Sequence, residues 1–267
     1  MEGALRLGMI GFGAIGGAVA AGLAGSGITL AGVLVRDRSL ESVRARVTTG
    51  IQVVSKLPDL LALHPRVILE CAGHEALRAY GADVLRAGKD LVISSVGALA
   101  DQELHDKLVH AASAGGRLVI PSGALGGLDA LGAARRAGLQ SVNYVSRKAP
   151  AAWKGTKAEE LINLATISEP TVFYRGAARQ AALDFPKNAN VVAAVALAGI
   201  GFDRTEVELI ADPTSHGNRH VVCAQGPFGQ LVADVLARTF PENPKTSMLT
   251  PYSILRAMEN LSGSVVI

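Results

Sequence analysis

Short aliphatic stretches alternate with amphipathic stretches from residue 5 to about residue 121. The aliphatic stretches predict strands over residues 6–10, 29–35, 66–71, 90–94 and 117–120. The stretches between them predict helices over residues 14–24, 40–47, 75–87 and 101–114. Strands and helices in this order are typical of right-handed βαβ units around a parallel sheet. We therefore expect an α/β fold whose N-terminal part is a doubly wound Rossmann sheet.

The pattern changes after about residue 127, where strands become longer and helices fewer. Strands are predicted over residues 139–147, 171–175, 204–211 and 219–224, and helices over residues 188–198, 230–239 and 251–261. This arrangement favours a second, α+β domain that binds substrate and forms a dimer. We expect domains over residues 1–122 and 123–245, followed by a C-terminal segment, 246–267, whose helix packs back on the Rossmann domain.

Composition agrees with a folded α/β protein and argues against several other classes. The chain has 267 residues, of which 49% are hydrophobic and 18% charged, with a formal net charge of +3. Acidic and basic residues are interspersed, which argues against a nucleic-acid partner. The longest apolar stretch, residues 190–202, is too short to span a bilayer, and the N-terminus lacks a secretory pattern. Two distant cysteines favour a reducing compartment, so we expect a cytoplasmic protein.

The most informative local motif is GFGAIG at residues 11–16, which follows a strand pattern and opens a helix pattern. Gly11 permits the tight turn, Gly13 lets the backbone approach a pyrophosphate, and Gly16 lets the helix pack closely on the strand. The first helical residues, Ala14 and Ile15, add backbone N–H groups at the positive end of the helix dipole. The motif predicts that these five residues bind a dinucleotide.

The choice between NAD and NADP depends on the residues after the second strand. An acid at this position accepts hydrogen bonds from the ribose hydroxyls of NAD, whereas an arginine accommodates the 2′-phosphate of NADP. The chain has both, since Arg36 precedes Asp37. We expect NAD as the cofactor, with NADP also accepted.

Histidines are the first candidates for acid–base chemistry, because the nicotinamide itself takes up the hydride. His220 and His216 lie at a loop-to-strand junction, where an imidazole can point into a cleft from a rigid edge. Asn218 lies between them and is a candidate for substrate binding. The intervening Gly217 and Asn218 argue against a helix, and no cysteine or HExxH spacing completes a metal site, so we expect no metal.

Further candidates for substrate binding are basic or amide side chains near the ends of predicted elements. Arg147 and Lys148 offer positive charge for a carboxylate, and Lys187 or Asn190 can face the nicotinamide or the substrate. Asn188 precedes an apolar helix and is a candidate N-cap.

Several longer segments together resemble the L-aspartate dehydrogenase family, and the resemblance covers essentially the whole chain. The segments are GFGAIG, ECAG followed by SSVGALAD, IPSGALGGLDAL, SRKAP, FPKNANVVAAVALAGIGFDRTEVELIADP, NRHVV and NPKTSMLTPYSILRAM. Dihydrodipicolinate reductase and homoserine dehydrogenase share the architecture but not this series of segments. They remain alternatives on the same scaffold, and a non-catalytic NAD(P)H sensor is an alternative of another class.

The resemblance implies oxidation of L-aspartate at Cα by NAD(P)+ to iminoaspartate. The imine then hydrolyses to oxaloacetate and ammonia or is used in NAD biosynthesis. In the family, the histidine of NRHVV is catalytic, which corresponds to His220 here. The alanine of PSGALGG and the second asparagine of PKNAN contact the cofactor, which corresponds to Ala124 and Asn190. We further expect a homodimer.

Overall fold

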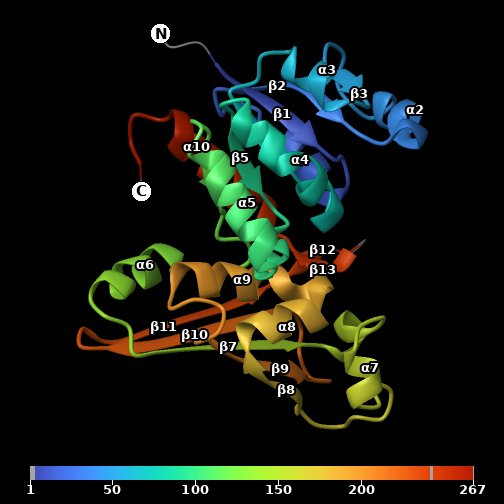
Figure 1. Cartoon of the computed structure of the whole chain (residues 1–267). Coiled ribbons are helices and arrows are strands. Elements are labelled where there is room, and N and C mark those ends of the chain that lie inside the picture. Colours follow the sequence, from blue (N-terminus) through green and yellow to red (C-terminus); the bar gives the residue numbers. More distant parts are fainter. Residues whose placement is uncertain (1–3, 241–242, 267) are drawn as a thin grey trace. The chain divides into compact units, whose positions relative to one another are not determined.

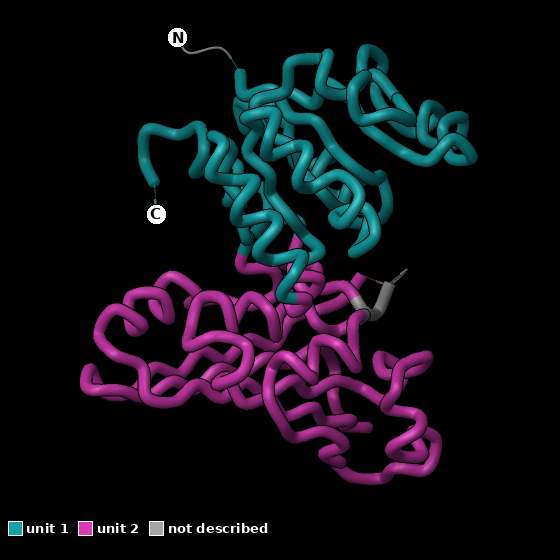
Figure 2. Tube along the Cα trace, viewed as in Figure 1, with its two compact units in different colours: residues 1–95, 102–121, 251–267 teal, residues 96–101, 122–250 magenta. Residues whose placement is uncertain are grey.

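The computed structural model describes residues 4–240 and 243–266, apart from the side chains of residues 187 and 243–245. The chain divides into two compact units (Figure 2). Unit 1 comprises residues 1–95, 102–121 and 251–267, and unit 2 comprises residues 96–101 and 122–250. Among the described residues, no helix is long and apolar enough to cross a membrane.

Unit 1 contains a six-stranded parallel sheet in the order β3-β2-β1-β4-β5-β6 (Figure 1). Its strands are β1 (Leu5–Ile10), β2 (Ile28–Leu34), β3 (Gln52–Val54), β4 (Val67–Glu70), β5 (Asp90–Ile93) and β6 (Leu118–Val119). Its helices are α1 (Ala14–Ala21), η1 (Asp37–Ser39), α2 (Leu40–Arg44), α3 (Leu57–Leu61), α4 (His74–Arg86), α5 (Gln102–Ala112) and most of α10 (Leu249–Ser262). This strand order is that of a Rossmann sheet, which confirms the α/β fold class predicted from the sequence.

The core of unit 1 lies where β1 and its neighbours meet α1 and α10. Leu7 and Met9 of β1 are fully buried in this cluster, together with Val19 of α1. Ile254 and Met258 of α10 belong to the same cluster and are equally buried. The C-terminal helix therefore packs on the Rossmann sheet of its own unit, because its apolar residues recur at helical spacing.

Unit 2 contains a five-stranded mixed sheet in the order β11-β10-β7-β9-β8, in which only the β7–β9 pair is parallel. Its strands are β7 (Ser141–Lys148), β8 (Thr171–Ala177), β9 (Glu206–Ala211), β10 (Asn218–Gly226) and β11 (Gly229–Ala237), and a separate antiparallel pair consists of β12 (Thr239–Phe240) and β13 (Asn243–Ser247). Its helices are η2 (Val96–Ala100), α6 (Leu128–Arg136), η3 (Pro150–Trp153), α7 (Ala158–Leu161), α8 (Ala178–Asp184), η4 (Pro186–Asn188) and α9 (Ala189–Ala198). Helices α6, α8 and α9 lie along one face of the larger sheet (Figure 1).

The helix predicted over residues 230–239 is wrong, because this segment is strand β11. A tight turn joins β11 to β10, and the two strands pair along their full length from Asn218 with Ala237 to Gly226 with Gly229. Side chains along β11 alternate between exposed and partly buried, which is the period of a strand at a sheet edge. The exposed Val232 and Leu236 conceal this alternation in the sequence, because two apolar residues four positions apart match the spacing of a helix.

Candidate functional site

The glycine loop between β1 and α1 has the geometry that each of its glycines predicts. Gly11 has φ +94°, and a Cβ there would lie 2.7–2.9 Å from atoms of Ala72. A Cβ on Gly16 would lie 3.0–3.1 Å from Gly11 O, Met9 Sδ and Cys71 Sγ, so this glycine lets α1 pack closely on the sheet. A Cβ on Gly13 would meet nothing within 4 Å, which leaves its side open to a ligand.

The first turn of α1 is accessible next to this open position. Gly13 and Ala14 are exposed and Ile15 is half-buried. The backbone N–H groups of a first helical turn have no partner within the helix, so they can donate to phosphate oxygens. The described residues therefore fit the pyrophosphate of a dinucleotide.

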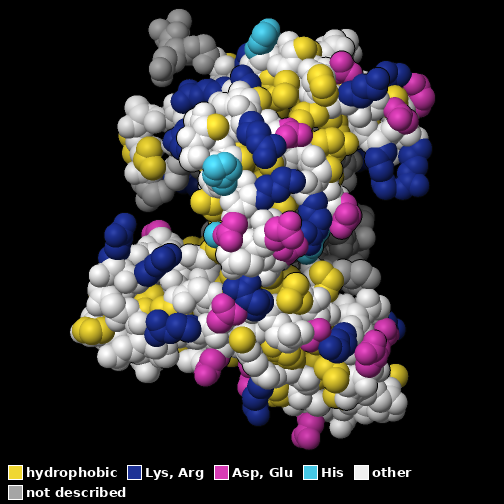
Figure 3. Space-filling view, in the orientation of Figure 1, with side chains coloured by type: hydrophobic (Ala, Val, Ile, Leu, Met, Phe, Trp, Pro, Cys, Tyr) yellow, Lys and Arg dark blue, Asp and Glu magenta, His cyan; other side chains and the backbone are white. Residues whose placement is uncertain are grey.

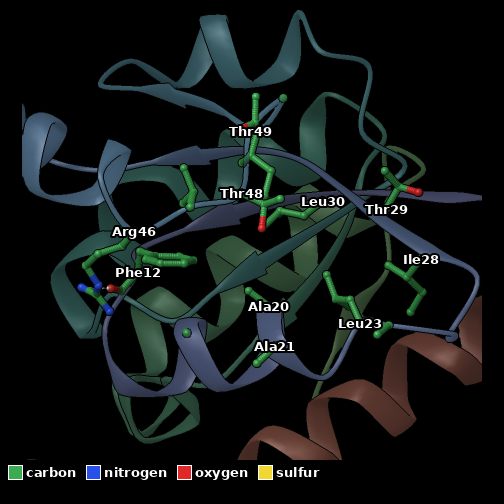
Figure 4. A pocket seen from close by; sticks show the side chains of 15 residues that line it. Phe12, Ala20, Ala21, Leu23, Ile28, Thr29, Leu30, Arg46, Thr48 and Thr49 are labelled. Carbon is green, nitrogen blue, oxygen red and sulfur yellow. Dashed lines mark hydrogen bonds between the residues drawn. The ribbon is translucent and has the colours of Figure 1, made fainter.

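Arg46 lies in the loop after α2 and contacts the glycine loop. Its Nη1 donates to Phe12 O at 3.4 Å, and its guanidinium lies 5.2 Å from the centroid of the Phe12 ring (Figure 4). The pair lies at a cavity of about 790 Å³ that is lined by α1, β2 and residues 46–51. Apart from Arg46, the lining consists of threonines and of small or apolar side chains, so this cavity adds no carboxylate and no histidine to the site.

Arg36 and Asp37 are both exposed and follow β2 directly, at the carboxyl end of the parallel sheet. Asp37 begins the short helix η1. This is the edge at which ligands of open α/β sheets bind, so both side chains are available to a ribose or a 2′-phosphate.

A buried carboxylate that the sequence analysis missed supports the glycine loop from β4. Glu70 is 1% exposed, and its Oε1 accepts hydrogen bonds from Ala72 N and Gly73 N, each at 2.8 Å. Ser95 donates to the same carboxylate through Oγ at 3.0 Å and through its backbone N–H at 3.2 Å. Burial raises the pKa of Glu70, although these hydrogen bonds oppose the rise. Glu70 thus joins the loops after β4 and β5, and the first of these loops contacts Gly11.

His220 lies in unit 2 on the helix-covered face of the sheet and is 2% exposed. Its Nδ1 lies 2.6 Å from the hydroxyl oxygen of Tyr144 on β7. Burial, together with the positive charge of Lys148, lowers the pKa of His220 to about 3. The histidine is therefore neutral near pH 7, and it does not have the ordinary pKa that an exposed imidazole would have.

Lys148 lies on the same face of β7 and places a buried positive charge in this neighbourhood. Its Nζ donates to Asn188 Oδ1 at 2.9 Å and lies 5.1 Å from the centroid of the Trp153 ring. Asn188 Nδ2 is a buried donor that has no hydrogen-bond partner in the described part of the chain. Asn188 occupies the N-cap position of α9, as the sequence predicts, but its side chain makes no cap hydrogen bond to this helix. An ammonium and an unused amide donor side by side suit a carboxylate ligand.

The expected cofactor contacts of unit 2 lie near η2 and in the loop before α6. Asn190 is exposed at the start of α9, and its Oδ1 accepts a hydrogen bond from Gly97 N at 2.9 Å. A Cβ on Gly97 would lie 2.7 Å from Ala189 Cβ, so η2 packs tightly on α9. Ala124 is buried in the turn that follows Gly123, whose φ is +67°.

The structure does not bring every predicted substrate residue together. Arg147 lies on the opposite face of β7 from Lys148 and forms an ion pair with Asp212 at 3.4 Å. His216 is exposed in the turn before β10, whereas Asn218 is buried on the same face as His220. The side chain of Lys187 lies outside the described part of the chain.

Tyr144, Ser146 and Asn188 are the residues of this neighbourhood to which the sequence analysis gave no site role. A signal was present for the first two, because residues at i, i+2 and i+4 of a strand share a face with Lys148. The sequence alone did not indicate that this face is the buried one.

Charge and metal-binding groups do not suggest another kind of site. Lys and Arg are intermixed with Asp and Glu on the face that Figure 3 shows. Within residues 4–240 and 243–266, no three His, Cys, Asp or Glu side chains are grouped to hold a metal ion.

Two family models match successive parts of the chain. The family model described as "Homoserine dehydrogenase, NAD binding domain" matches residues 11–121, and "Aspartate dehydrogenase, C-terminal" matches residues 129–261. The Rossmann sheet, its glycine loop and the second mixed sheet define an NAD-dependent dehydrogenase. The L-aspartate dehydrogenase of Acinetobacter baumannii is 42% identical over 256 residues, which are 96% of this chain and 97% of that protein. The chain therefore belongs to the L-aspartate dehydrogenase family, as its sequence segments predicted.

Two further relatives support the same assignment. The L-aspartate dehydrogenase of Ruegeria pomeroyi is 42% identical over 262 residues, covering 98% of this chain and 94% of that protein. The crystal structure of aspartate dehydrogenase from Thermotoga maritima has a TM-score of 0.75 at 25% identity and covers 98% of this chain and 99% of that chain. Both units are therefore shared with the family.

Proposed function

We propose that this protein oxidises L-aspartate at Cα with NAD+, giving iminoaspartate, NADH and a proton. The imine is then hydrolysed to oxaloacetate and ammonia or used in NAD biosynthesis. The observation that carries the proposal is the buried Lys148–Asn188 pair near His220, because it provides donors for a carboxylate beside a residue suited to catalysis.

The cofactor half of the proposal rests on the glycine loop of the N-terminal domain, which we place at residues 1–122. Gly11, Gly13 and Gly16 shape the loop, and the N–H groups of the first turn of α1 hold the pyrophosphate. Asp37 holds the ribose hydroxyls, while Arg36 allows NADP to be accepted as well. Ala124 and Asn190, from the domain at residues 123–245, provide further cofactor contacts. NAD+, when bound, supplies the hydride acceptor.

The substrate half of the proposal rests on unit 2. The Lys148 ammonium and the Asn188 amide donate to a carboxylate of aspartate. The buried Asn218 lies on the same face of the sheet and provides a further side chain for substrate binding. Fixing the substrate in this way aligns its Cα–H bond and supplies much of the rate acceleration. His220 is the catalytic residue and acts in the neutral form, because burial keeps its pKa far below 7.

The direct test is the growth of the NADH absorbance band when purified protein is mixed with NAD+ and L-aspartate. We expect a rate that depends on L-aspartate and is absent with D-aspartate or homoserine. Oxidation of homoserine instead, or reduction of dihydrodipicolinate with NADH, would show that the protein has the activity of a related enzyme and that aspartate is not its substrate. NADH binding with no turnover on any of these compounds would support a sensor.

Cofactor preference is tested separately by comparing kcat/KM for NAD+ and NADP+. We expect a higher value for NAD+ in the unmodified protein. Asp37→Ala is expected to shift the ratio toward NADP+, and Arg36→Ala to shift it toward NAD+. Equal ratios in all three proteins would show that this turn does not contact the ribose.

We also propose that the uncovered face of the sheet in unit 2 joins a second copy of the chain. Helices cover only one face, while Val232 and Leu236 of β11 are 57% and 64% exposed on the other. Four charged side chains of this face form two ion pairs, Arg219 with Asp234 and Arg175 with Glu208, so an apolar contact next to them buries no lone charge from these groups. A self-complementary face of this kind suits a two-fold homodimer.

The oligomeric state tests this surface. We expect a dimer in light-scattering measurements after size-exclusion chromatography, and a monomer for the double variant Val232→Glu/Leu236→Glu. Val109 is similarly exposed on α5 of unit 1, so Val109→Glu is the matched control and is expected to remain dimeric. A monomeric unmodified protein would contradict the proposal.

We place the enzyme in the cytoplasm. Cys71 and Cys223 are both free, which agrees with a reducing compartment. Localisation of a fluorescently tagged full-length chain tests this placement.

A further inference from the structure

Three neutral polar groups form a buried chain on the inner face of the sheet in unit 2. Tyr144, Ser146 and His220 are each at most 2% exposed. The Tyr144 hydroxyl oxygen lies 2.6 Å from His220 Nδ1, and the two rings stack with centroids 6.0 Å apart and planes inclined by 11°. The Ser146 hydroxyl forms a hydrogen bond with Tyr144.

Strand register explains why these side chains meet. His220 of β10 lies opposite Ser146 of β7, and Tyr144 lies two residues from Ser146 on the same face. A diagonal neighbour of this kind is within reach of an aromatic side chain. The register of the antiparallel pair β7–β10 therefore sets this contact.

The chemistry of the two groups indicates which one donates across the 2.6 Å contact. A phenolic O–H, with an ordinary pKa of about 10, is a far stronger acid than the N–H of a neutral imidazole. The unprotonated imidazole nitrogen is in turn a better acceptor than a phenolic oxygen. The Tyr144 O–H is therefore the favoured donor, and Nδ1 accepts through its lone pair.

Protonation of the two groups agrees with this direction. Burial lowers the pKa of His220 and raises the pKa of Tyr144, so both are neutral near pH 7. The Ser146 hydrogen bond lowers the pKa of Tyr144, as expected when the Ser146 hydroxyl donates to the phenolic oxygen. The proton of Tyr144 is then directed to Nδ1, so the single ring proton of His220 is on Nε2.

We propose that Tyr144, held by Ser146, fixes His220 as the tautomer whose single proton is on Nε2, so that His220 acts on the substrate as a hydrogen-bond donor. Tyr144 and Ser146 are positioning residues, and the inference rests on the proposed catalytic role of His220. The Nε2–H group donates to an oxygen of the bound dicarboxylate and takes no proton from its amine.

The tautomer is measured directly by 15N NMR of the full-length protein labelled at its histidines, with His220→Ala used to assign the signals. We expect His220 Nε2 to be protonated and Nδ1 to be unprotonated. Tyr144→Phe is expected to lose this preference and to lower kcat roughly tenfold or more, because the wrong tautomer cannot donate from Nε2. Protonation of Nδ1 in the unmodified protein would overturn the proposal, whatever the activity.

Tyr174→Phe is the matched control. Tyr174 is a partly buried tyrosine of strand β8, which is separated from β7 by β9 in the same sheet, and its hydroxyl donates to Ala177 O at 2.9 Å. Its loss is expected to leave both the His220 tautomer and kcat unchanged. If the two variants reduce kcat equally, the effect of Tyr144→Phe comes from lost packing and the proposal fails.

A second pair of variants avoids changing the tyrosine. The amide of Gln at position 220 places its NH2 near the position of Nε2, whereas the amide of Asn places it near Nδ1. We expect His220→Gln to keep at least about tenfold more turnover than His220→Asn, since only Gln retains the donor. The reverse order would show that His220 works as an acceptor. Full turnover in both variants would instead refute the catalytic role of His220, and the NMR result would still decide the tautomer.

Discussion

The glycine loop of unit 1 and the histidine cluster of unit 2 are built in different ways. The loop owes its shape to residues without side chains, and Gly13 leaves space that a ligand can occupy. The cluster owes its shape to buried polar side chains, of which Tyr144, Lys148 and His220 are almost inaccessible to water. A site made of backbone groups can bind a cofactor, but it has no titratable group whose pKa could be shifted. Buried side chains can have shifted pKa values, and their hydrogen bonds must offset the free-energy cost of desolvation.

The strongest test of this difference is His220→Ala. We expect kcat to fall by roughly 10²–10⁴ because a catalytic side chain is lost, while the Kd for NADH is unchanged. Steady-state kinetics and a fluorescence titration with NADH measure the two quantities. A large loss of NADH affinity would mean that the histidine belongs to the cofactor site as well.

Lys148→Met tests whether the cluster binds the carboxylate. A charge-assisted hydrogen bond contributes about 1.5–3 kcal/mol, so the KM for aspartate is expected to rise by roughly 10- to 100-fold. Lys157→Met removes a partly exposed ammonium of unit 2 that pairs with Asp184 at 3.0 Å, and it is expected to leave KM unchanged. Equal effects of the two variants would assign the change to general electrostatics.

Gly13→Val tests the loop in the same manner. The Cβ of the new side chain meets no protein atom within 4 Å, so the melting temperature is expected to change little, while the Kd for NADH rises roughly tenfold or more through collision with the ligand. Gly132 of α6 also has open space at its Cβ position, and Gly132→Val serves as the control with normal NADH binding. Unchanged NADH affinity in Gly13→Val would place the cofactor elsewhere.

Glu70→Gln tests a buried side chain that supports the loop. Glutamine offers a single acceptor oxygen, so one of the hydrogen bonds to Ala72, Gly73 or Ser95 is lost and the Kd for NADH is expected to rise several-fold. Unfolding should become easier by about 1–3 kcal/mol, because a buried donor loses its partner. Asp90→Asn changes a buried carboxylate at the opposite end of the sheet, where Asp90 pairs with Arg117, and should destabilise the fold without affecting NADH. Equal changes in the Kd for NADH in the two variants would show that Glu70 acts only on the stability of the fold.

The smallest expected effect is on stability at acid pH. The folded state holds His220 with a pKa of about 3, whereas the unfolded chain has the ordinary value of about 6.5, so only the unfolded state takes up a proton between these values. Stability contributed by the neutral histidine is therefore complete above about pH 6.5 and falls as the pH is lowered toward 3. Urea unfolding of the unmodified protein should show about 1–2 kcal/mol more loss between about pH 7 and pH 5 than His220→Gln shows. Identical losses would mean that His220 titrates normally in the folded state.

The same contrast explains what could be predicted from the sequence. Regular alternation and the glycine spacing gave the Rossmann sheet and its loop, because backbone geometry restricts which residues can occupy such a turn. His220 was singled out by its place at a strand start and by family resemblance. Tyr144 and Asn188 were assigned no catalytic role, since their roles depend on strand register and on a contact with Lys148 that links residues 40 positions apart.

Two other features have the same origin. The low pKa of His220 cannot be predicted from the sequence, because burial is a property of the folded sheet and cannot be read from neighbouring residues. The sequence predicts a helix where the structure has strand β11, because the exposed Val232 and Leu236 conceal the alternation that the pairing with β10 reveals. Local patterns predict elements well, whereas pairing between distant segments decides the chemistry of the second unit.

The proposed reaction is tested most directly by following deuterium from L-aspartate labelled at Cα. The enzyme, NAD+ and this substrate are mixed, and the NADH formed is analysed by mass spectrometry. We predict that each NADH carries one deuterium and that ammonia appears in equal amount. NADH without deuterium, or no NADH at all from a protein that binds the cofactor, would contradict oxidation of aspartate at Cα.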